Sequence, residues 1–104
     1  MKQRVALLVD DQKSICQTLA DVLSDEGWDS ISASSGIEAL ALLKKVRVDL
    51  VFLDIWMKGL DGIETLQKIK ERDKNIPIVV MSGHGTIDTA VKATRLGAME
   101  FLEK

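Results

Sequence analysis

Residues 48–62 read VDLVFLDIWMKGLDG, and this stretch decides the fold of the chain. Its apolar part, Leu50–Leu53, has four consecutive apolar residues that include Val and Phe. Such a short run predicts a β-strand that is buried on both faces. Asp54 directly follows the run, and a glycine-bounded loop comes after it. Asp54 is therefore expected at the carboxyl end of a central strand, facing the rest of the chain's polar residues.

Length and composition limit what Asp54 can do. The 104 residues allow one domain with a modest core, which we place at residues 1–104. A net charge of -2 gives no electrostatic basis for binding nucleic acid or an anionic membrane. The apolar runs fall short of the roughly 20 residues that span a bilayer, and the N-terminus does not resemble a signal peptide. We expect a cytoplasmic chain, and its single cysteine, Cys16, excludes an internal disulfide.

Two further runs in the first third of the chain predict strands. Val5–Val9 is a second buried run, and it stops at Asp10 and Asp11 just as the later run stops at Asp54. Residues 28–33 are a weaker candidate with few apolar side chains, as expected for a strand at the edge of a sheet. Two strands are thus predicted to end in acids.

The last third of the chain supplies two more strand candidates. Pro77 stands near the start of the run Ile76–Met81, where a strand best tolerates a missing amide hydrogen. Ser82 follows this run directly. The final candidate is Ala98–Leu102, and Lys104 comes shortly after it.

Four amphipathic helices are predicted between the strands, because apolar residues recur there at spacings of three and four. The positions expected to face the core are Ile15, Leu19, Val22 and Leu23, then Ile37, Leu40 and Leu43, then Ile63, Leu66 and Ile69, and finally Ile87, Ala90, Val91 and Thr94. Ser35, Asp61 and Thr86 are the expected N-caps of the last three helices. Gly27 and Gly97 are the expected stops of the first and the fourth.

Strict alternation of strand and helix with short connections predicts an α/β domain with a parallel sheet. In such a sheet the carboxyl ends of all strands lie on one edge, where ligands bind. The polar residues that follow strands should therefore converge on that edge; they are Asp10, Asp11, Asp54, Ser82 and Lys104.

This constellation favours a divalent cation and phosphoryl chemistry. Clustered carboxylates repel one another, and a cation removes the conflict. Oxygen ligands without histidine or cysteine suit a hard ion, and a few carboxylates with water and phosphate suit Mg²⁺ better than Ca²⁺. A carboxylate such as Asp54 can also attack phosphorus, while a hydroxyl such as Ser82 and an ammonium such as Lys104 can neutralise the transferred group.

The four motifs LLVDDQ, LVFLDIWMKGLDG, IVVMSGHGT and FLEK, each placed after its own strand, resemble the receiver (CheY-like) domain of bacterial two-component response regulators. The resemblance covers the whole chain in the right order. It implies a flavodoxin-like, doubly wound five-stranded parallel sheet of order 2-1-3-4-5. The segment SGHGTIDTAVKATRLGA and the tryptophan in DIWM are most similar to nitrogen-regulation receivers attached to AAA+ enhancer-binding transcription activators.

The resemblance also implies a role for each site residue. Asp54 would be the phosphoacceptor, and Asp10 and Asp11 would hold Mg²⁺ directly or through water, together with Asp54 itself and the backbone carbonyl of Trp56. Ser82 would bond the bound phosphoryl group and Lys104 would pair with it. Phe101 would be the switch aromatic whose rotation accompanies movement of Ser82.

The same resemblance implies the partners. The phosphodonor would be the phosphohistidine of a sensor histidine kinase, and transfer to Asp54 would be followed by slow hydrolysis. The chain would then be a signalling domain, not an enzyme, that supports its own phosphotransfer and autodephosphorylation. It would control an output, with transcription expected, through the face formed by the fourth helix and the fifth strand, which contacts an output domain or a second protomer in a homodimer.

Two features depart from the family pattern. Lys58 stands where the family usually has a proline after the phosphoacceptor, which makes that loop less rigid. The family also continues past the lysine with a fifth helix, whereas this chain ends at Lys104. We expect a domain trimmed from a longer response regulator; the alternative is that a partner or a swapped element covers the bare part of the sheet.

Three other functions use similar residues or a similar fold. An Mg²⁺-dependent phosphohydrolase with an aspartyl-phosphate intermediate would want a second acid two residues after the nucleophile, where this chain has Trp56. A phosphate-independent interaction module of the same fold is compatible with the missing fifth helix. A flavin-binding domain is disfavoured, because acids after the first strand repel a flavin phosphate. Asp10 and Asp11 have the simpler alternative of capping the first helix.

Overall fold

The computed structural model describes residues 3–55, 62–83 and 87–103, without the side chains of 87–89. Strands and helices alternate strictly along it. The strands are β1 (Val5–Val9), β2 (Asp29–Ala33), β3 (Leu50–Asp54), β4 (Ile78–Ser82) and β5 (Glu100–Glu103). The helices are α1 (Lys13–Asp25), α2 (Gly36–Leu43), α3 (Gly62–Arg72) and α4 (Ile87–Arg95). Each predicted element is present, with ends shifted by one or two residues.

The five strands form one parallel sheet in the order β2-β1-β3-β4-β5, which confirms the expected doubly wound arrangement. The weakly apolar strand β2 lies at an edge, as its composition indicated. The central strand β3 lies between β1 and β4, so the Asp54 strand has a neighbour on each side. Strand order reverses between β1 and β3, at the position where doubly wound sheets bind ligands.

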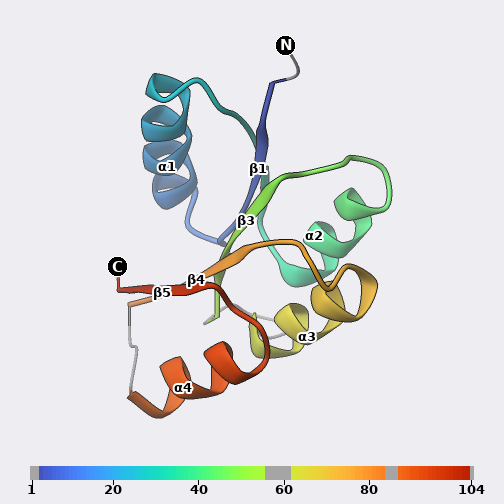
Figure 1. Cartoon of the computed structure of the whole chain (residues 1–104). Helices are drawn as coiled ribbons and strands as arrows, with labels where there is room; N and C mark the ends of the chain where they lie inside the picture. Colours follow the sequence, from blue (N-terminus) through green and yellow to red (C-terminus); the bar gives the residue numbers. More distant parts are fainter. Residues whose placement is uncertain (1–2, 56–61, 84–86, 104) are drawn as a thin grey trace.

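Helices cover the sheet in two layers (Figure 1). Helix α1 lies on one face, and α2, α3 and α4 lie on the other. The main hydrophobic core fills the space under the three helices and includes Leu7, Val51, Leu53, Leu66 and Val80, all fully buried. A smaller cluster under α1 is formed by Ala6, Leu8 and Cys16. The two layers therefore differ in size, and the larger one anchors β3 and β4.

The prediction that Leu50–Leu53 is buried on both faces holds for one face. Val51 and Leu53 point into the main core and are fully buried. Leu50 and Phe52 point to the α1 side and are only half-buried, because α1 is the one described helix on that face and it packs mainly over β1 and β2. Leu102, further along the same face, is 43% exposed.

Helix ends follow the predicted signals where they are described. The Ser35 hydroxyl accepts a hydrogen bond from the backbone N–H of Glu38 at 3.1 Å, which caps α2. The Glu38 carboxylate accepts bonds from the backbone N–H and hydroxyl of Ser34, one residue earlier than a standard capping box places them. Gly27 and Gly97 follow α1 and α4 with φ of 84° and 107°, a left-handed conformation that stops a helix.

The apolar stripes of the helices were predicted less well. In α4, Ala93 is fully buried, whereas Val91 is 44% exposed and Thr94 is exposed. The prediction that Val91 and Thr94 face the core is wrong. Ala93 faces the core instead, and its small side chain allows α4 to pack closely on the sheet. Val22 and Ile37, also predicted to face the core, are exposed. None of the helices in the described ranges combines the length and apolarity that a membrane span requires.

Candidate functional site

The carboxyl ends of β1 and β3 bring three acids together. Asp54 is the last residue of β3, and Asp10 and Asp11 directly follow β1. In the parallel pairing of these strands Val9 lies opposite Leu53, so the next residues, Asp10 and Asp54, are neighbours. One carboxylate oxygen from each acid lies within 4.8 Å of the others. The predicted convergence of the three acids on this edge is confirmed.

Burial differs among the three acids. Asp10 and Asp54 are each 2% exposed, whereas Asp11 lies at the surface. Two carboxylates held close together and out of water cost free energy unless they are compensated. A fold selected for stability alone has no reason to place them there, so the arrangement indicates a site for positive charge.

Local hydrogen bonds fix Asp10 in this position. Its Oδ1 accepts from the backbone N–H of Gln12 at 2.9 Å, and its own N–H donates to the Ala33 carbonyl oxygen at 3.1 Å. The N-cap of α1 is Gln12, which makes no side-chain cap hydrogen bond. The alternative that both acids serve only as helix caps is therefore wrong: Asp10 orders the turn from β1 into α1, and Asp11 is not the cap.

The donor set fits a hard divalent cation. All three side chains offer oxygen, and none of the described ligand atoms in the cluster comes from histidine or cysteine. Mg²⁺ binds oxygen at about 2.0–2.1 Å and usually keeps several waters. Oxygens within 4.8 Å of one another allow one such cation to contact some carboxylates directly and others through water. Of the three acids, Asp11 is the exposed one.

Ser82 lies beside this cluster on the next strand. Asp54 pairs with Met81 in the β3–β4 register, and Ser82 is the following residue and the end of β4. The Ser82 side chain is fully buried. Side chains alternate along a strand, so Ser82 shares its sheet face with Val80, on the side covered by α2, α3 and α4.

Phe101 is a neighbour of Ser82 across the β4–β5 pair. Phe101 pairs with Val80, and Glu103 pairs with Ser82, so Phe101 and Ser82 are diagonal neighbours on one face. Phe101 is half-buried and packs against the main core. The two residues predicted to act together in a switch are thus adjacent in the sheet.

Gly62 is a site-forming residue that the sequence analysis did not single out. A Cβ at this position would collide with the Cα of Ile55 and lie 2.6 Å from the Asp54 carbonyl oxygen. The Gly62 N–H donates to the Ile55 carbonyl oxygen at 3.3 Å. Helix α3 can therefore begin against the backbone of the Asp54 strand only because position 62 has no side chain. The glycine that closes the stretch 48–62 was the available signal.

Several predicted positions lie outside the described residues. They are Trp56 and Lys104 among the site residues, Lys58 among the departures, and the caps Asp61 and Thr86. Their proposed roles stay predictions from the sequence.

Comparison with known proteins agrees with the fold and identifies the family. Residues 6–104 match the response regulator receiver domain family. The chain is 45% identical over 100 residues to the nitrogen assimilation regulatory protein NtrX of Azorhizobium caulinodans, covering 94% of this chain and 22% of that protein. It is 38% identical over 104 residues to sporulation initiation phosphotransferase F of Bacillus subtilis, covering 100% of this chain and 84% of that protein. The chain thus spans about a fifth of the length of the NtrX-type regulators that it matches.

Solved structures give the same result. The receiver domain of NtrX from Brucella abortus superposes with a TM-score of 0.90 and 46% identity, over 95% of this chain and 84% of that chain. A chain of the CheX-CheY-BeF3-Mg complex from Borrelia burgdorferi superposes with a TM-score of 0.93 and 33% identity, over 97% of this chain and 78% of that one. The predicted resemblance to receivers, and to nitrogen-regulation receivers among them, is confirmed.

Proposed function

The chain belongs to the response regulator receiver domain family, and on that premise we propose that it is a phosphorylation-switched domain that accepts a phosphoryl group on Asp54. Receiver domains are signalling domains, and phosphorylation and Mg²⁺ binding at an acidic pocket are general in the family. The observation that carries the proposal is the convergence of Asp10, Asp11 and Asp54 within 4.8 Å. The first two acids and Asp54 would hold Mg²⁺.

The proposed transfer is a displacement at phosphorus. A carboxylate oxygen of Asp54 attacks the phosphorus of a phosphohistidine on the kinase, forming an O–P bond as the N–P bond breaks. The imidazole leaves with the bonding electron pair and takes up a proton. Bound Mg²⁺ supplies charge neutralisation for the phosphoryl oxygens, and the Ser82 hydroxyl and Lys104 ammonium add donors. Later attack of water on phosphorus releases phosphate and restores the Asp54 carboxylate, and we expect this reaction to be slow because Trp56 stands where a phosphohydrolase would have its second acid.

The proposed switch links Asp54 to the β4–β5 side of the sheet. Ser82 and Asp54 are both buried and end neighbouring strands, so the Ser82 hydroxyl is a candidate to bond the phosphoryl group on Asp54. Phe101 is the diagonal neighbour of Ser82 in the β4–β5 pair. Movement of the Ser82 side chain would therefore change the packing around the aromatic ring of Phe101. The expected readout is a changed surface on α4 and β5.

The proposed partners follow from the relatives. The donor is a sensor histidine kinase, and the α4–β5 face contacts an output domain or a second copy of the chain. We propose that residues 1–104 act as one receiver domain of a longer cytoplasmic regulator of transcription, because the NtrX protein of Azorhizobium caulinodans is a nitrogen assimilation regulator about five times as long. Direct binding of this chain to nucleic acid or membrane is not part of the proposal.

Beryllofluoride, which mimics a phosphoryl group on aspartate, tests this function without a kinase. We expect BeF₃⁻ with Mg²⁺ to shift the backbone NMR signals of β4, α4 and β5, and to shift nothing in Asp54→Asn. Asp73→Asn, which changes an exposed aspartate at the other edge of the sheet, is the matched control and should respond like the natural chain. An interaction module that lacks the switch would show no Mg²⁺-dependent response. A phosphohydrolase would release phosphate from acetyl phosphate over many rapid turnovers.

A further inference from the structure

A groove of about 670 Å³ lies at the amino ends of β3 and β4, whereas the acidic cluster lies at the carboxyl ends of the strands. Its walls are the connection from α2 to β3 and the connection from α3 to β4, which precede the strands that end in Asp54 and Ser82. Strands of five residues rise about 3.3 Å per residue, so roughly 16 Å of sheet separate the two sites. The groove is therefore distinct from the site of phosphorylation.

The floor of the groove is apolar and rigid. Val48, Ile69 and Ile76 line it and are only 8%, 1% and 7% exposed, and all three belong to the main hydrophobic core. The Lys70 ammonium donates to the carbonyl oxygen of Ile76 at 2.6 Å, which holds the turn before β4 in place. These three side chains are nearly buried, and the more exposed apolar atoms that a ligand could contact belong to Leu43, Val46 and Pro77.

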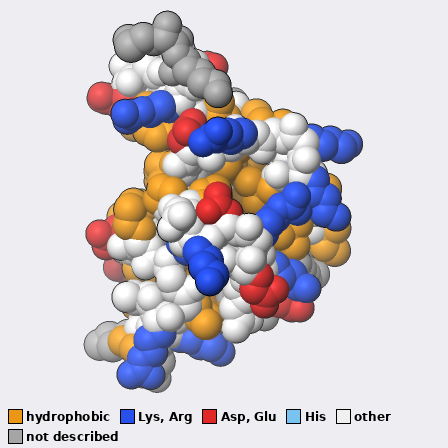
Figure 2. Space-filling model, turned by 45° about the vertical axis from the view of Figure 1, so that its right-hand side comes forward, with side chains coloured by type: hydrophobic (Ala, Val, Ile, Leu, Met, Phe, Trp, Pro, Cys, Tyr) orange, Lys and Arg blue, Asp and Glu red, His pale blue; other side chains and the backbone are white. Residues whose placement is uncertain are grey.

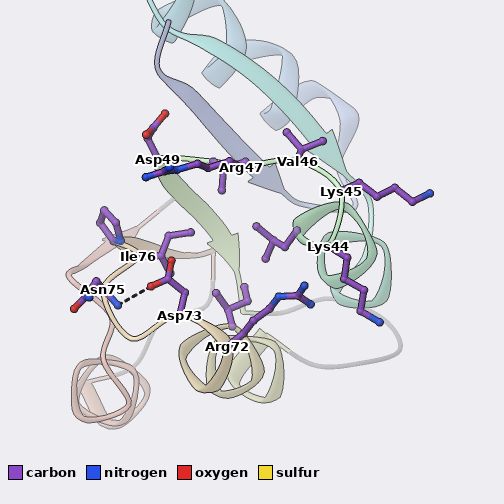
Figure 3. A pocket seen from close by; sticks show the side chains of 13 residues that line it. Lys44, Lys45, Val46, Arg47, Asp49, Arg72, Asp73, Asn75 and Ile76 are labelled. Carbon is purple, nitrogen blue, oxygen red and sulfur yellow. Dashed lines mark hydrogen bonds between the residues drawn. The ribbon is translucent and has the colours of Figure 1, made fainter. Parts of the chain in front are cut away.

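The rim of the groove is basic. It carries Lys44, Lys45, Arg47 and Arg72, and within the described part of the chain none of these four side chains has an ion pair or hydrogen bond. Arg47 extends from the α2–β3 wall, and Arg72 lies on the facing wall at the end of α3 (Figure 3). Figure 2 shows Lys and Arg side chains on this side of the molecule, with hydrophobic and acidic side chains between them.

The two carboxylates in the lining are engaged elsewhere. Asp49 Oδ2 accepts from the backbone N–H of Val5 at 2.9 Å, and Asp73 Oδ1 accepts from the backbone N–H of Asn75 at 3.0 Å. Both bonds order the chain around the groove, and both carboxylates keep their charge, so the lining has four cations against two anions. The rim thus keeps an excess of positive charge on a chain whose net charge is -2.

From this combination we propose that the groove docks an acidic segment of a partner polypeptide, with an apolar side chain seated on the floor. Charge complementarity selects the acidic residues, and the apolar floor selects a peptide over a bare phosphate or a nucleic acid backbone. Because the docking site lies opposite to Asp54, it can hold a partner while the phosphorylation edge stays accessible.

The test uses a short fluorescein-labelled peptide of glutamates with two leucines, titrated with the full chain and read by fluorescence anisotropy. We expect saturable binding that weakens as salt screens the charges. Backbone NMR shifts caused by the unlabelled peptide should concentrate in residues 43–49 and 69–77. The matching peptide with leucines replaced by serines should bind less tightly.

Charge-reversal variants test whether peptide binding depends on the groove or on surface charge in general. The double variant Arg47→Glu and Arg72→Glu should weaken binding by about tenfold, equivalent to about 1.4 kcal/mol. Lys92→Glu, a single charge reversal on the exposed surface of α4, should leave affinity within about twofold, as expected for a distant surface charge. Circular dichroism checks that each variant keeps its fold, and a substituted chain that unfolds is replaced by Arg47→Gln with Arg72→Gln.

Four results would overturn the proposal, and the first three come from the binding and NMR experiments. These are no saturable binding, NMR shifts centred away from the groove, or equal loss in Lys92→Glu. Displacement of the peptide by inorganic phosphate or by a DNA duplex at lower concentrations than the acidic peptide itself would also overturn it, because the site would then be a phosphate site. None of these outcomes bears on Asp54, so the proposed phosphoryl transfer is tested separately.

Discussion

At the scale of single residues, the acids were predictable and the glycine was not. Asp10 and Asp54 were placed correctly because each directly follows an apolar run, and the ends of parallel strands share one edge. The role of Gly62 could not be predicted from the sequence, because Gly62 allows a contact with the backbone of Ile55, a residue of another segment. Thr65, fully buried in α3, was missed for a related reason: its hydroxyl makes it look like a surface residue.

Gly62→Ala should damage both stability and the site. The added methyl group meets backbone atoms, which cannot rotate away, so we expect a loss of about 1–3 kcal/mol in the free energy of unfolding. Urea denaturation followed by circular dichroism measures this loss. Mg²⁺ affinity, measured by titration calorimetry, should fall as well, because the collision is with the strand end that carries Asp54.

Gly27→Ala is the matched control for that experiment. A Cβ at position 27 meets nothing within 4 Å, but the φ of 84° makes any side chain unfavourable there. Stability should therefore fall by about 1 kcal/mol, while Mg²⁺ affinity stays unchanged. If the two variants lost Mg²⁺ affinity equally, close packing at position 62 would not be what positions the site.

At the scale of elements, strands and helix caps were predicted better than helix faces. Caps depend on residues that are close in sequence, such as Ser35 and Glu38, so the signal is local. The burial of Ala93 in place of Val91 was decided by how closely α4 approaches the sheet, which periodicity does not report. Half-burial of Leu50 and Phe52 likewise depends on which helices cover a face.

Ser35→Ala should remove the cap of α2 and lower the free energy of unfolding by about 1 kcal/mol. The lost interaction is the bond from the Glu38 N–H to the Ser35 hydroxyl at 3.1 Å. Ser24→Ala provides the control, because Ser24 is an exposed residue of α1 and alanine favours a helix. Chemical denaturation should show no loss for Ser24→Ala; an equal loss in both would exclude the cap as the cause.

At the scale of the whole molecule, the carboxyl ends and the amino ends of the strands in one sheet carry opposite charge. The carboxyl edge gathers Asp10, Asp11 and Asp54, and the amino edge carries the basic groove. The α/β class and the acidic edge followed from the order of apolar runs, because each strand end is fixed by its own short segment, whereas the strand order came from the family resemblance. The groove did not, since its residues come from two connections that become neighbours only when β3 and β4 pair.

Mg²⁺ should stabilise the whole domain through the acidic cluster. A ligand that binds only the folded chain raises its melting temperature, and we expect this increase for the natural chain and its loss in Asp11→Asn. In EDTA, Asp11→Asn should melt at a higher temperature than the natural chain, because one of three repelling charges is gone. Differential scanning calorimetry measures both, with Asp21→Asn on the exposed surface of α1 as control. An unchanged Mg²⁺ response in Asp11→Asn would remove that residue from the metal site.

The most direct test of the central claim is the intact mass of the chain after incubation with acetyl phosphate, with and without Mg²⁺, beside Asp54→Asn. Asp54 is the acid of the cluster that ends the central strand β3, and the family resemblance makes it the expected acceptor. The account predicts one added phosphoryl group that requires Mg²⁺ and is absent from Asp54→Asn. No adduct on the natural chain, or an adduct that persists in Asp54→Asn, would contradict it.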